Sequence, residues 1–79
     1  MSSTWDRERA IRHLKNAAQS DDPRDAADEL DMAARRLRFE NDYTSQRVRR
    51  EIRDITEQTP LAEQQEIAHR ERRRLERGW

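Results

Sequence analysis

Glycine and proline are nearly absent from this chain, and their scarcity limits what it can fold into. The 79 residues include one glycine and two prolines, at Gly78, Pro23 and Pro60. Long stretches that lack a helix breaker and are rich in arginine, glutamate, alanine, glutamine and leucine favour α-helix. No segment alternates apolar and polar residues with the period of two that a half-buried strand requires. The chain is therefore predicted to be all-α, a small bundle of three to four helices in a single domain over residues 1–79.

The first two helices are predicted to form an antiparallel hairpin over residues 4–19 and 23–40. Ser3 is suited to cap the first helix, and Asp22 followed by Pro23 marks the start of the second. Each helix carries an alanine-rich apolar stripe at helical spacing. Small side chains let two helices approach closely, which favours packing of the two stripes against each other. The stripe of the second helix consists of Ala26, Ala27, Leu30, Ala33, Ala34 and Leu37.

Two further helices are predicted at residues 43–58 and 60–77, with the Asn41-Asp42 dipeptide as the turn before them. The helix over 43–58 has an apolar stripe of Val48, Ile52 and Ile55. The stripe on the last helix is thinner and recurs every seven residues, at Leu61, Ala68 and Leu75. Such a repeat is typical of a helix that pairs with a second helix. Segment 60–79 is thus expected to complete the bundle, to project from it, or to bind a partner.

The chain has little apolar material with which to form a core. Only 32% of it is hydrophobic, much of that alanine, and 43% is charged. Burying a large apolar side chain contributes about 1.5–3 kcal/mol, and so few of them only just offset the entropy lost on folding. A partner, or a second copy in a homodimer, would add buried area. Met32 and Phe39, on the side of helix 23–40 away from its stripe, are expected either to pack against the third or fourth helix or to face a partner. The candidate partner-binding residues are Met32, Phe39, Leu61, Ala68 and Leu75.

Several classes of function are disfavoured. The chain has no cysteine, so it has neither a disulfide nor a thiolate metal site. Glu66 and His69 have the Glu-x-x-His spacing of di-iron bundles, but such sites need a second copy and two more glutamates, and no metal or other cofactor is predicted. Without a glycine-rich phosphate loop or a serine in a nucleophile context, an enzyme is not predicted. The absence of a long apolar run or signal peptide predicts no membrane association and a cytoplasmic location.

Charge is arranged in blocks, although the formal net charge is zero. Met1–Ala34 and Asp54–Glu66 are acidic, whereas Arg35–Arg53 and Ile67–Trp79 are basic, and nearly all the positive charge is arginine. The planar guanidinium group suits two-pronged contacts with carboxylate or phosphate. The first basic block therefore predicts a face for an acidic protein partner or for nucleic acid. Its members are Arg35, Arg36, Arg38, Gln46, Arg47, Arg49, Arg50 and Arg53.

The nucleic-acid alternative interprets segment 35–55 as a helix-turn-helix, with Gln46 and Arg50 pointing outward from its second helix. Zero net charge argues against it, because nucleic-acid-binding domains are usually basic. Many arginines also have a carboxylate four residues further on, as on a solvated helix face. These pairs are Arg47 with Glu51, Arg50 with Asp54, Arg53 with Glu57, and Arg72 with Glu76. The preferred prediction is a small non-enzymatic helical module for protein–protein interaction or self-association, and the alternative is a small DNA-binding regulator.

Overall fold

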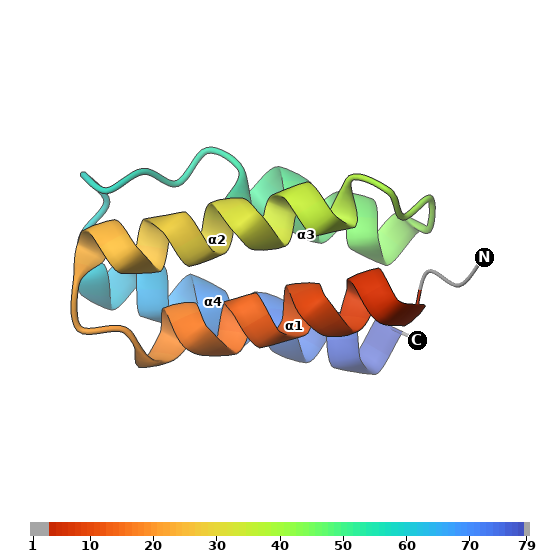
Figure 1. The fold of residues 1–79 in the computed structure, drawn as a ribbon, viewed down its shortest axis with the longest axis horizontal. Coiled ribbons are helices and arrows are strands. Elements are labelled where there is room, and N and C mark those ends of the chain that lie inside the picture. Colours follow the sequence, from red (N-terminus) through yellow and green to blue (C-terminus); the bar gives the residue numbers. More distant parts are fainter. Residues whose placement is uncertain (1–3, 79) are drawn as a thin grey trace.

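Residues 4–78 fold into four helices that pack side by side, each antiparallel to the one before it (Figure 1). The computed structural model describes residues 4–78, so Ser3, the predicted cap of the first helix, lies outside the described part. The helices are α1 (Thr4–Gln19), α2 (Pro23–Leu37), α3 (Tyr43–Ile52) and α4 (Leu61–Gly78). The prediction of a small all-α bundle is confirmed.

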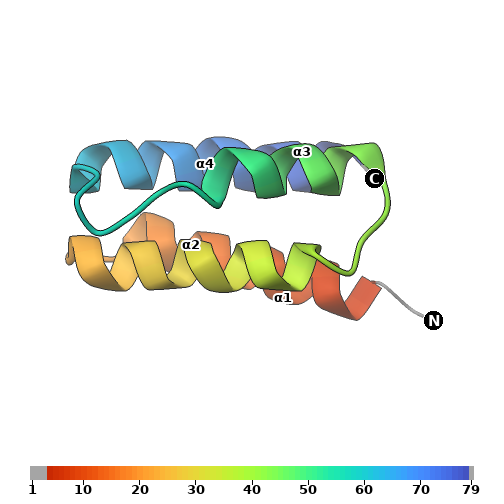
Figure 2. The same ribbon diagram turned by 90° about the horizontal axis from the view of Figure 1, so that it is seen from above.

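The four helices form two layers of two helices each (Figures 1 and 2). Figure 2 shows α1 beside α2 in one layer and α3 beside α4 in the other. Contacts also join α1 to α4 and α2 to α3, and α2 meets α4 across the diagonal. The bundle measures 35 × 19 × 17 Å. The start of α1, the end of α4 and the connection from α2 to α3 all lie at the same end of it (Figure 1).

The core runs along the axis of the bundle and draws on all four helices. The alanine-rich stripes of α1 and α2 meet in it as predicted, and Val48 and Ile52 of α3 are buried against them. Four partly buried apolar side chains, Ile11, Ala18, Ile55 and Ile67, pack against it. Its fully or nearly fully buried members are Ala10, Leu14, Ala17, Leu30, Ala33, Ala34, Leu37, Val48, Ile52, Ala68 and Leu75.

Helix α4 completes the bundle and does not project from it. Ala68 and Leu75 have no exposed surface, because they are packed in the hydrophobic core of their own chain. The prediction that these two residues contact a partner is therefore wrong. Leu61, the third member of the seven-residue repeat, is partly buried at the start of the helix. The narrow apolar stripe of α4 therefore packs against other helices of its own chain.

Two aspartates cap the helices whose starts the sequence signals best. Asp22 accepts a hydrogen bond from the backbone N–H of Arg24 at 3.0 Å, and Pro23 occupies the first helical position. Asp42 accepts one from the N–H of Ser45 at 3.0 Å and begins α3. A side-chain oxygen at this position satisfies an N–H group that the helix itself leaves unpaired. The predicted break at Asn41-Asp42 is confirmed.

Helix α2 ends at Leu37, three residues earlier than predicted. The N–H of Phe39 bonds to the carbonyl of Arg36 at 3.4 Å, and that of Glu40 bonds to Leu37 at 3.0 Å. These bonds span three residues, so the last turn is tighter than an α-helix. The tightening goes with an inward turn of Glu40, whose buried carboxylate lies 3.6 Å from the guanidinium of Arg7.

Helix α3 ends at Ile52, six residues earlier than predicted. Beyond it, the hydroxyl of Thr56 accepts a hydrogen bond from the N–H of Gln58 at 3.2 Å, and that of Thr59 accepts one from the N–H of Thr56 at 3.4 Å. Threonine side chains that bond locally to the backbone compete with helix formation. Residues 53–60 therefore follow an irregular path along α2 and cover the half of the bundle that α3 does not reach (Figure 1).

Gln64 secures this irregular segment from inside the bundle. Its side chain is fully buried on α4. Its amide nitrogen donates to the carbonyl of Thr59 at 2.9 Å, to that of Pro23 at 3.1 Å and, more weakly, to that of Thr56 at 3.4 Å. One side chain thus ties the connection before α4 to the start of α2.

The variant Gln64→Leu is expected to lose about 1–3 kcal/mol of the free energy of unfolding. Leucine has a similar volume but removes the buried amide that donates to the carbonyls of Thr59 and Pro23. Urea unfolding followed by circular dichroism measures the change. Gln19→Leu, at an exposed position on α1, is the control and should shift the free energy by no more than about 0.5 kcal/mol. Equal effects of the two substitutions would contradict the role given to Gln64.

Candidate interaction surface

Because successive helices are antiparallel, most of the arginines lie in one half of the bundle and most of the carboxylates in the other. Segments 4–12, 35–51 and 67–77, which form one half of the bundle, carry 14 arginines and 7 carboxylates. Segments 13–34 and 52–66, which form the other half, carry 3 basic side chains and 10 carboxylates. A chain of zero net charge is therefore strongly polarised along its long axis. We refer to the first half as the basic end and to the second as the acidic end.

Three of the four aromatic side chains are exposed at the basic end. Trp5 at the start of α1 is 61% exposed, Phe39 after α2 is 61% exposed, and Tyr43 at the start of α3 is 70% exposed. The guanidinium of Arg9 lies 3.9 Å from the centre of the Trp5 ring. The guanidinium of Arg38 lies 5.1 Å from the centre of the Phe39 ring. Each arginine is close enough for a cation–π interaction.

The arginines of α3 are not neutralised by the carboxylates that the sequence offers them. Arg47, Arg49 and Arg50 form no salt bridge within residues 4–78. Glu51, four residues after Arg47, lies 3.6 Å from Arg70 of α4. The spacing of four residues between α3 arginines and carboxylates is thus not accompanied by ion pairs within the helix, because Glu51 contacts α4 instead.

The other two predicted acidic partners on and after α3 behave in the same way. Glu57 accepts a hydrogen bond from Arg24 of α2 at 3.0 Å, and this contact raises the pKa of the Arg24 guanidinium above its ordinary value. Asp54 lies 3.9 Å from the adjacent Arg53 instead of pairing with Arg50. Side chains on α3 and its exit thus leave a cationic surface open to a ligand.

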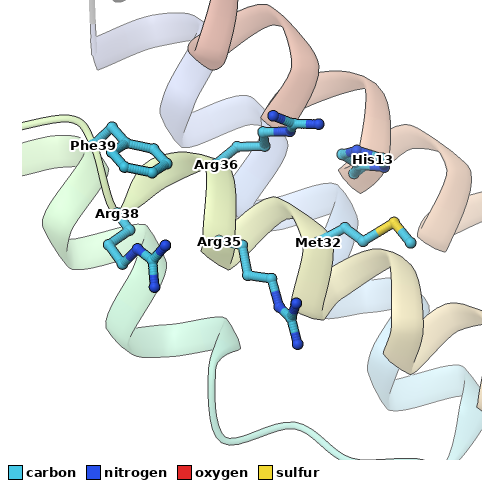
Figure 3. Close-up of a pocket in the computed structure, with 6 residues that line it drawn as sticks. All are labelled: His13, Met32, Arg35, Arg36, Arg38 and Phe39. Carbon is cyan, nitrogen blue, oxygen red and sulfur yellow. The ribbon is translucent and has the colours of Figure 1, made fainter.

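A shallow groove of about 380 Å³ runs between α1 and the outer side of α2. Figure 3 shows the side chains that line it, with Met32 beside His13, and Arg35 and Arg36 diverging to either side of the helix. Met32 is 47% exposed. A smaller groove, of about 140 Å³, lies between α2 and α3 and is lined in part by Arg35, Arg38, Arg49 and Arg53. The predicted basic face therefore spans two adjacent helices and the connection between them.

Not every residue of that predicted face is available. Gln46 donates a hydrogen bond from its side-chain amide to the carbonyl of Glu40, so it holds the connection between α2 and α3. Arg35 lies 3.0 Å from Asp31, although both side chains are largely exposed. Exposed pairs of this kind contribute only about 0–1 kcal/mol, so a ligand can displace them.

The arrangement of α2 and α3 is not that of a helix-turn-helix. In that motif the two helices cross at about 90–120°, which frees the second to enter a groove of DNA. Here α3 runs antiparallel to α2, and Val48 and Ile52 pack it into the bundle (Figure 2). The interpretation of segment 35–55 as a helix-turn-helix is wrong, because the apolar stripe of α3 aligns the helix with its neighbours.

Some buried polar contacts lie outside what sequence reasoning predicted. Glu71 on α4 is fully buried, and it accepts hydrogen bonds from Arg70 at 3.0 Å and from Arg74 at 3.1 Å. Nδ1 of His13 lies 2.7 Å from the carboxylate of Glu29 and links α1 to α2. The only signal for Glu71 in the sequence is its position between Ala68 and Leu75 on the buried stripe of the helix.

Comparisons with protein-family models, with curated proteins and with solved structures found no significant match to this chain. Over residues 4–78, no three histidine, aspartate or glutamate side chains are grouped so that they could hold a metal ion. No helix in this part of the chain is both long and apolar enough to cross a membrane. The exposed arginines and aromatic rings at the basic end are therefore the features from which a function is inferred.

The double variant Met32→Ser with Phe39→Ser is expected to keep its fold and to lose less than about 1 kcal/mol of the free energy of unfolding. Both side chains are largely exposed in the monomer and add little to its core. Leu30→Ala on the inner face of the same helix should cost about 2–5 kcal/mol. Chemical unfolding monitored by circular dichroism compares the three proteins. A loss in the serine variant as large as that of Leu30→Ala would place Met32 and Phe39 in the core.

Proposed function

We propose that this protein is a non-catalytic helical interaction module that binds an acidic protein partner at its basic end. One observation carries the proposal: Arg47, Arg49 and Arg50 are unpaired at the same end of the bundle as the exposed rings of Phe39 and Tyr43. Cationic groups without internal partners are free to bind carboxylates of another molecule. The neighbouring rings supply apolar contact area.

The composition of the basic end supports a protein partner. Tryptophan, tyrosine, phenylalanine, methionine and arginine are enriched in protein–protein interfaces, whereas lysine is depleted. Tryptophan, tyrosine and arginine also dominate the few residues that contribute most of the binding free energy. The contact of Arg9 with Trp5 at 3.9 Å holds both side chains in place, which lowers the entropy that binding would cost.

The polarity of the whole molecule supports an acidic partner. Complementary charge accelerates association and orients the two proteins as they meet. The acidic end repels the same partner, so the polarised bundle favours approach by the basic end. Arginine also forms two-pronged contacts with carboxylates, which lysine cannot form.

Nucleic acid is the competing ligand for the same cationic groups. The antiparallel packing of α2 and α3 and the internal hydrogen bond of Gln46 remove the support for readout of duplex DNA by a helix. Stacking of unpaired bases on exposed rings is the remaining mode of binding. The experiment below therefore includes a single-stranded oligonucleotide.

Charge reversal on α3 tests the proposal. The double variant Arg47→Glu with Arg50→Glu should bind a fluorescein-labelled poly-glutamate peptide at least about tenfold more weakly than the unmodified protein, a loss of about 1.4 kcal/mol. Fluorescence anisotropy at low salt and at about 0.15 M salt measures the affinity. The physical reason is that both substitutions place a negative charge where the peptide carboxylates would bind.

The matched control is Lys15→Glu with Arg24→Glu, which changes the net charge equally but at the acidic end. It should weaken binding by less than about threefold, since only the screened long-range field changes. Equal losses in the two variants would contradict a localised site. Tighter binding of a labelled oligothymidylate than of the peptide, abolished by the α3 variant alone, would instead make nucleic acid the ligand.

A further inference from the structure

The outer side of α2 carries a pattern that is complementary to itself. Its central line holds Asp25 and Met32, which are seven residues apart and so lie along one face of the helix, and Phe39 follows in the tighter turn after Leu37. Asp28 and Arg35 lie seven residues apart on one flank of this line. Glu29 and Arg36 lie seven residues apart on the other flank. Each flank thus pairs a carboxylate near the start of the helix with an arginine near its end.

This face is open to solvent in the monomer. Asp25, Asp28 and Arg35 are exposed, Met32 is 47% exposed and Phe39 is 61% exposed. Asp25 and Asp28 form no salt bridge within residues 4–78, and neither does Arg36. Figure 3 shows Met32 between the diverging side chains of Arg35 and Arg36. Arg35 lies 3.0 Å from Asp31 in an exposed pair that a ligand can displace, and Glu29 lies 2.7 Å from Nδ1 of His13. The face therefore combines apolar surface with charges of both signs, some of them held by weak pairs within the chain.

We infer that this face binds a second copy of the chain in an antiparallel dimer, with the two-fold axis at Met32. Antiparallel pairing about this residue sets Asp28 of one copy beside Arg35 of the other, and Glu29 beside Arg36. It also sets the two Met32 side chains against each other and brings Phe39 beside the partner's Asp25. Because the axis relates the copies, every cross-helix charge pair occurs twice. This surface shares the ring of Phe39 with the proposed function, but its charged residues lie on α2 and are separate from the α3 arginines.

Charge complementarity is what favours a second copy over other occupants. A partner for this face must present arginine, an apolar side chain and carboxylate in the reverse order along a helix, and α2 itself does so. A two-fold arrangement also ends with two copies, because each copy uses the same surface, and two-fold symmetric dimers are the commonest soluble oligomers. Antiparallel pairing sets the basic half of one bundle beside the acidic half of the other, so the two polarised charge distributions attract.

Sedimentation equilibrium from about 10 µM to about 1 mM, a range that covers moderate and weak affinities, tests the inference at low salt. The average mass should rise from that of the 9.6 kDa chain toward twice that value. Asp28→Arg alone and Arg35→Asp alone should each weaken the dimer at least about tenfold, because each places like charges in contact at two positions. A monomer throughout the concentration range would overturn the inference.

Mixing and recombination of the two variants separate pairing from misfolding. An equimolar mixture of the Asp28→Arg and Arg35→Asp chains should form a mixed dimer, since one chain then offers only arginine and the other only carboxylate on that flank. The chain that carries both substitutions should again form a dimer with itself. Residues 28 and 35 lie about 10 Å apart along one helix, so recovery requires a second copy. Failure of both recoveries would refute this register.

Cross-linking locates the axis independently. The natural chain has no cysteine, so a single substitution gives an unambiguous disulfide. Met32→Cys should form a covalent dimer under mild oxidation at least about tenfold faster than the control Arg50→Cys, because the two-fold axis brings its two copies within disulfide distance. Equal rates would exclude an axis at Met32. The peptide-binding test of the proposed function relies on Arg47 and Arg50, so the two ideas fail separately.

Discussion

The hydrogen bonds of Gln64 are the interaction on which the shape of the bundle depends. Helix α3 has only ten residues, and half of the length of α2 would otherwise lack a neighbour on that side. Residues 53–60 cover this half without regular structure, so their carbonyl groups need donors from elsewhere. Gln64 provides a donor from the interior, and Gln65 adds a hydrogen bond to the carbonyl of Ser20 at 2.8 Å. Two adjacent side chains of α4 thus hold both connections at the acidic end.

A second constraint follows from the thinness of the core. Alanine supplies much of the buried surface of α1 and α2, so these helices approach closely but gain little free energy from each contact. Two buried carboxylates lie beside the apolar core at the basic end. Glu40 lies near Arg7, and Glu71 binds Arg70 and Arg74, whose side chains reach the surface. Removing one of these arginines is costly, because it leaves a buried carboxylate without its opposite charge.

Most of the fold could be predicted from the sequence, and the failures have local causes. Periodicity located the buried stripe of α2 in full, since its six members are all buried. Sequence reasoning overestimated the length of α3. The composition up to Gln58 favours helix, but the hydroxyls of Thr56 and Thr59 accept hydrogen bonds from nearby backbone N–H groups. The stripe of α4 was recognisable, but a seven-residue repeat does not reveal whether its mate belongs to the same chain. Only the packing of Ala68 and Leu75 against the other helices decides that.

Less of the candidate interaction surface could be predicted. Spacing alone suggested that Arg47 would pair with Glu51, but Glu51 lies near Arg70 of the neighbouring helix. An exposed pair within one helix contributes about 0.3–0.5 kcal/mol, so a small difference in tertiary position is enough to redirect a side chain. The location of Trp5, Phe39 and Tyr43 at the same end of the bundle could not be predicted either, because it depends on where the antiparallel helices begin and end.

The positions at which the charge changes sign explain how a neutral chain acquires a strongly polarised surface. The sign changes within α2, between residues 34 and 35, and within α4, between residues 66 and 67, and antiparallel packing brings the basic parts of both helices to the same end. Net charge, which argued against an anionic ligand, is uninformative for such a molecule, because a ligand within about 8–10 Å experiences only the nearer end. In the proposed dimer the separation of charge along each bundle has two consequences. It aligns the two α2 helices in opposite directions, and the unpaired arginines of α3 then lie at opposite poles of the assembly. One charge pattern would therefore set both the register of self-association and the placement of two sites for an acidic partner.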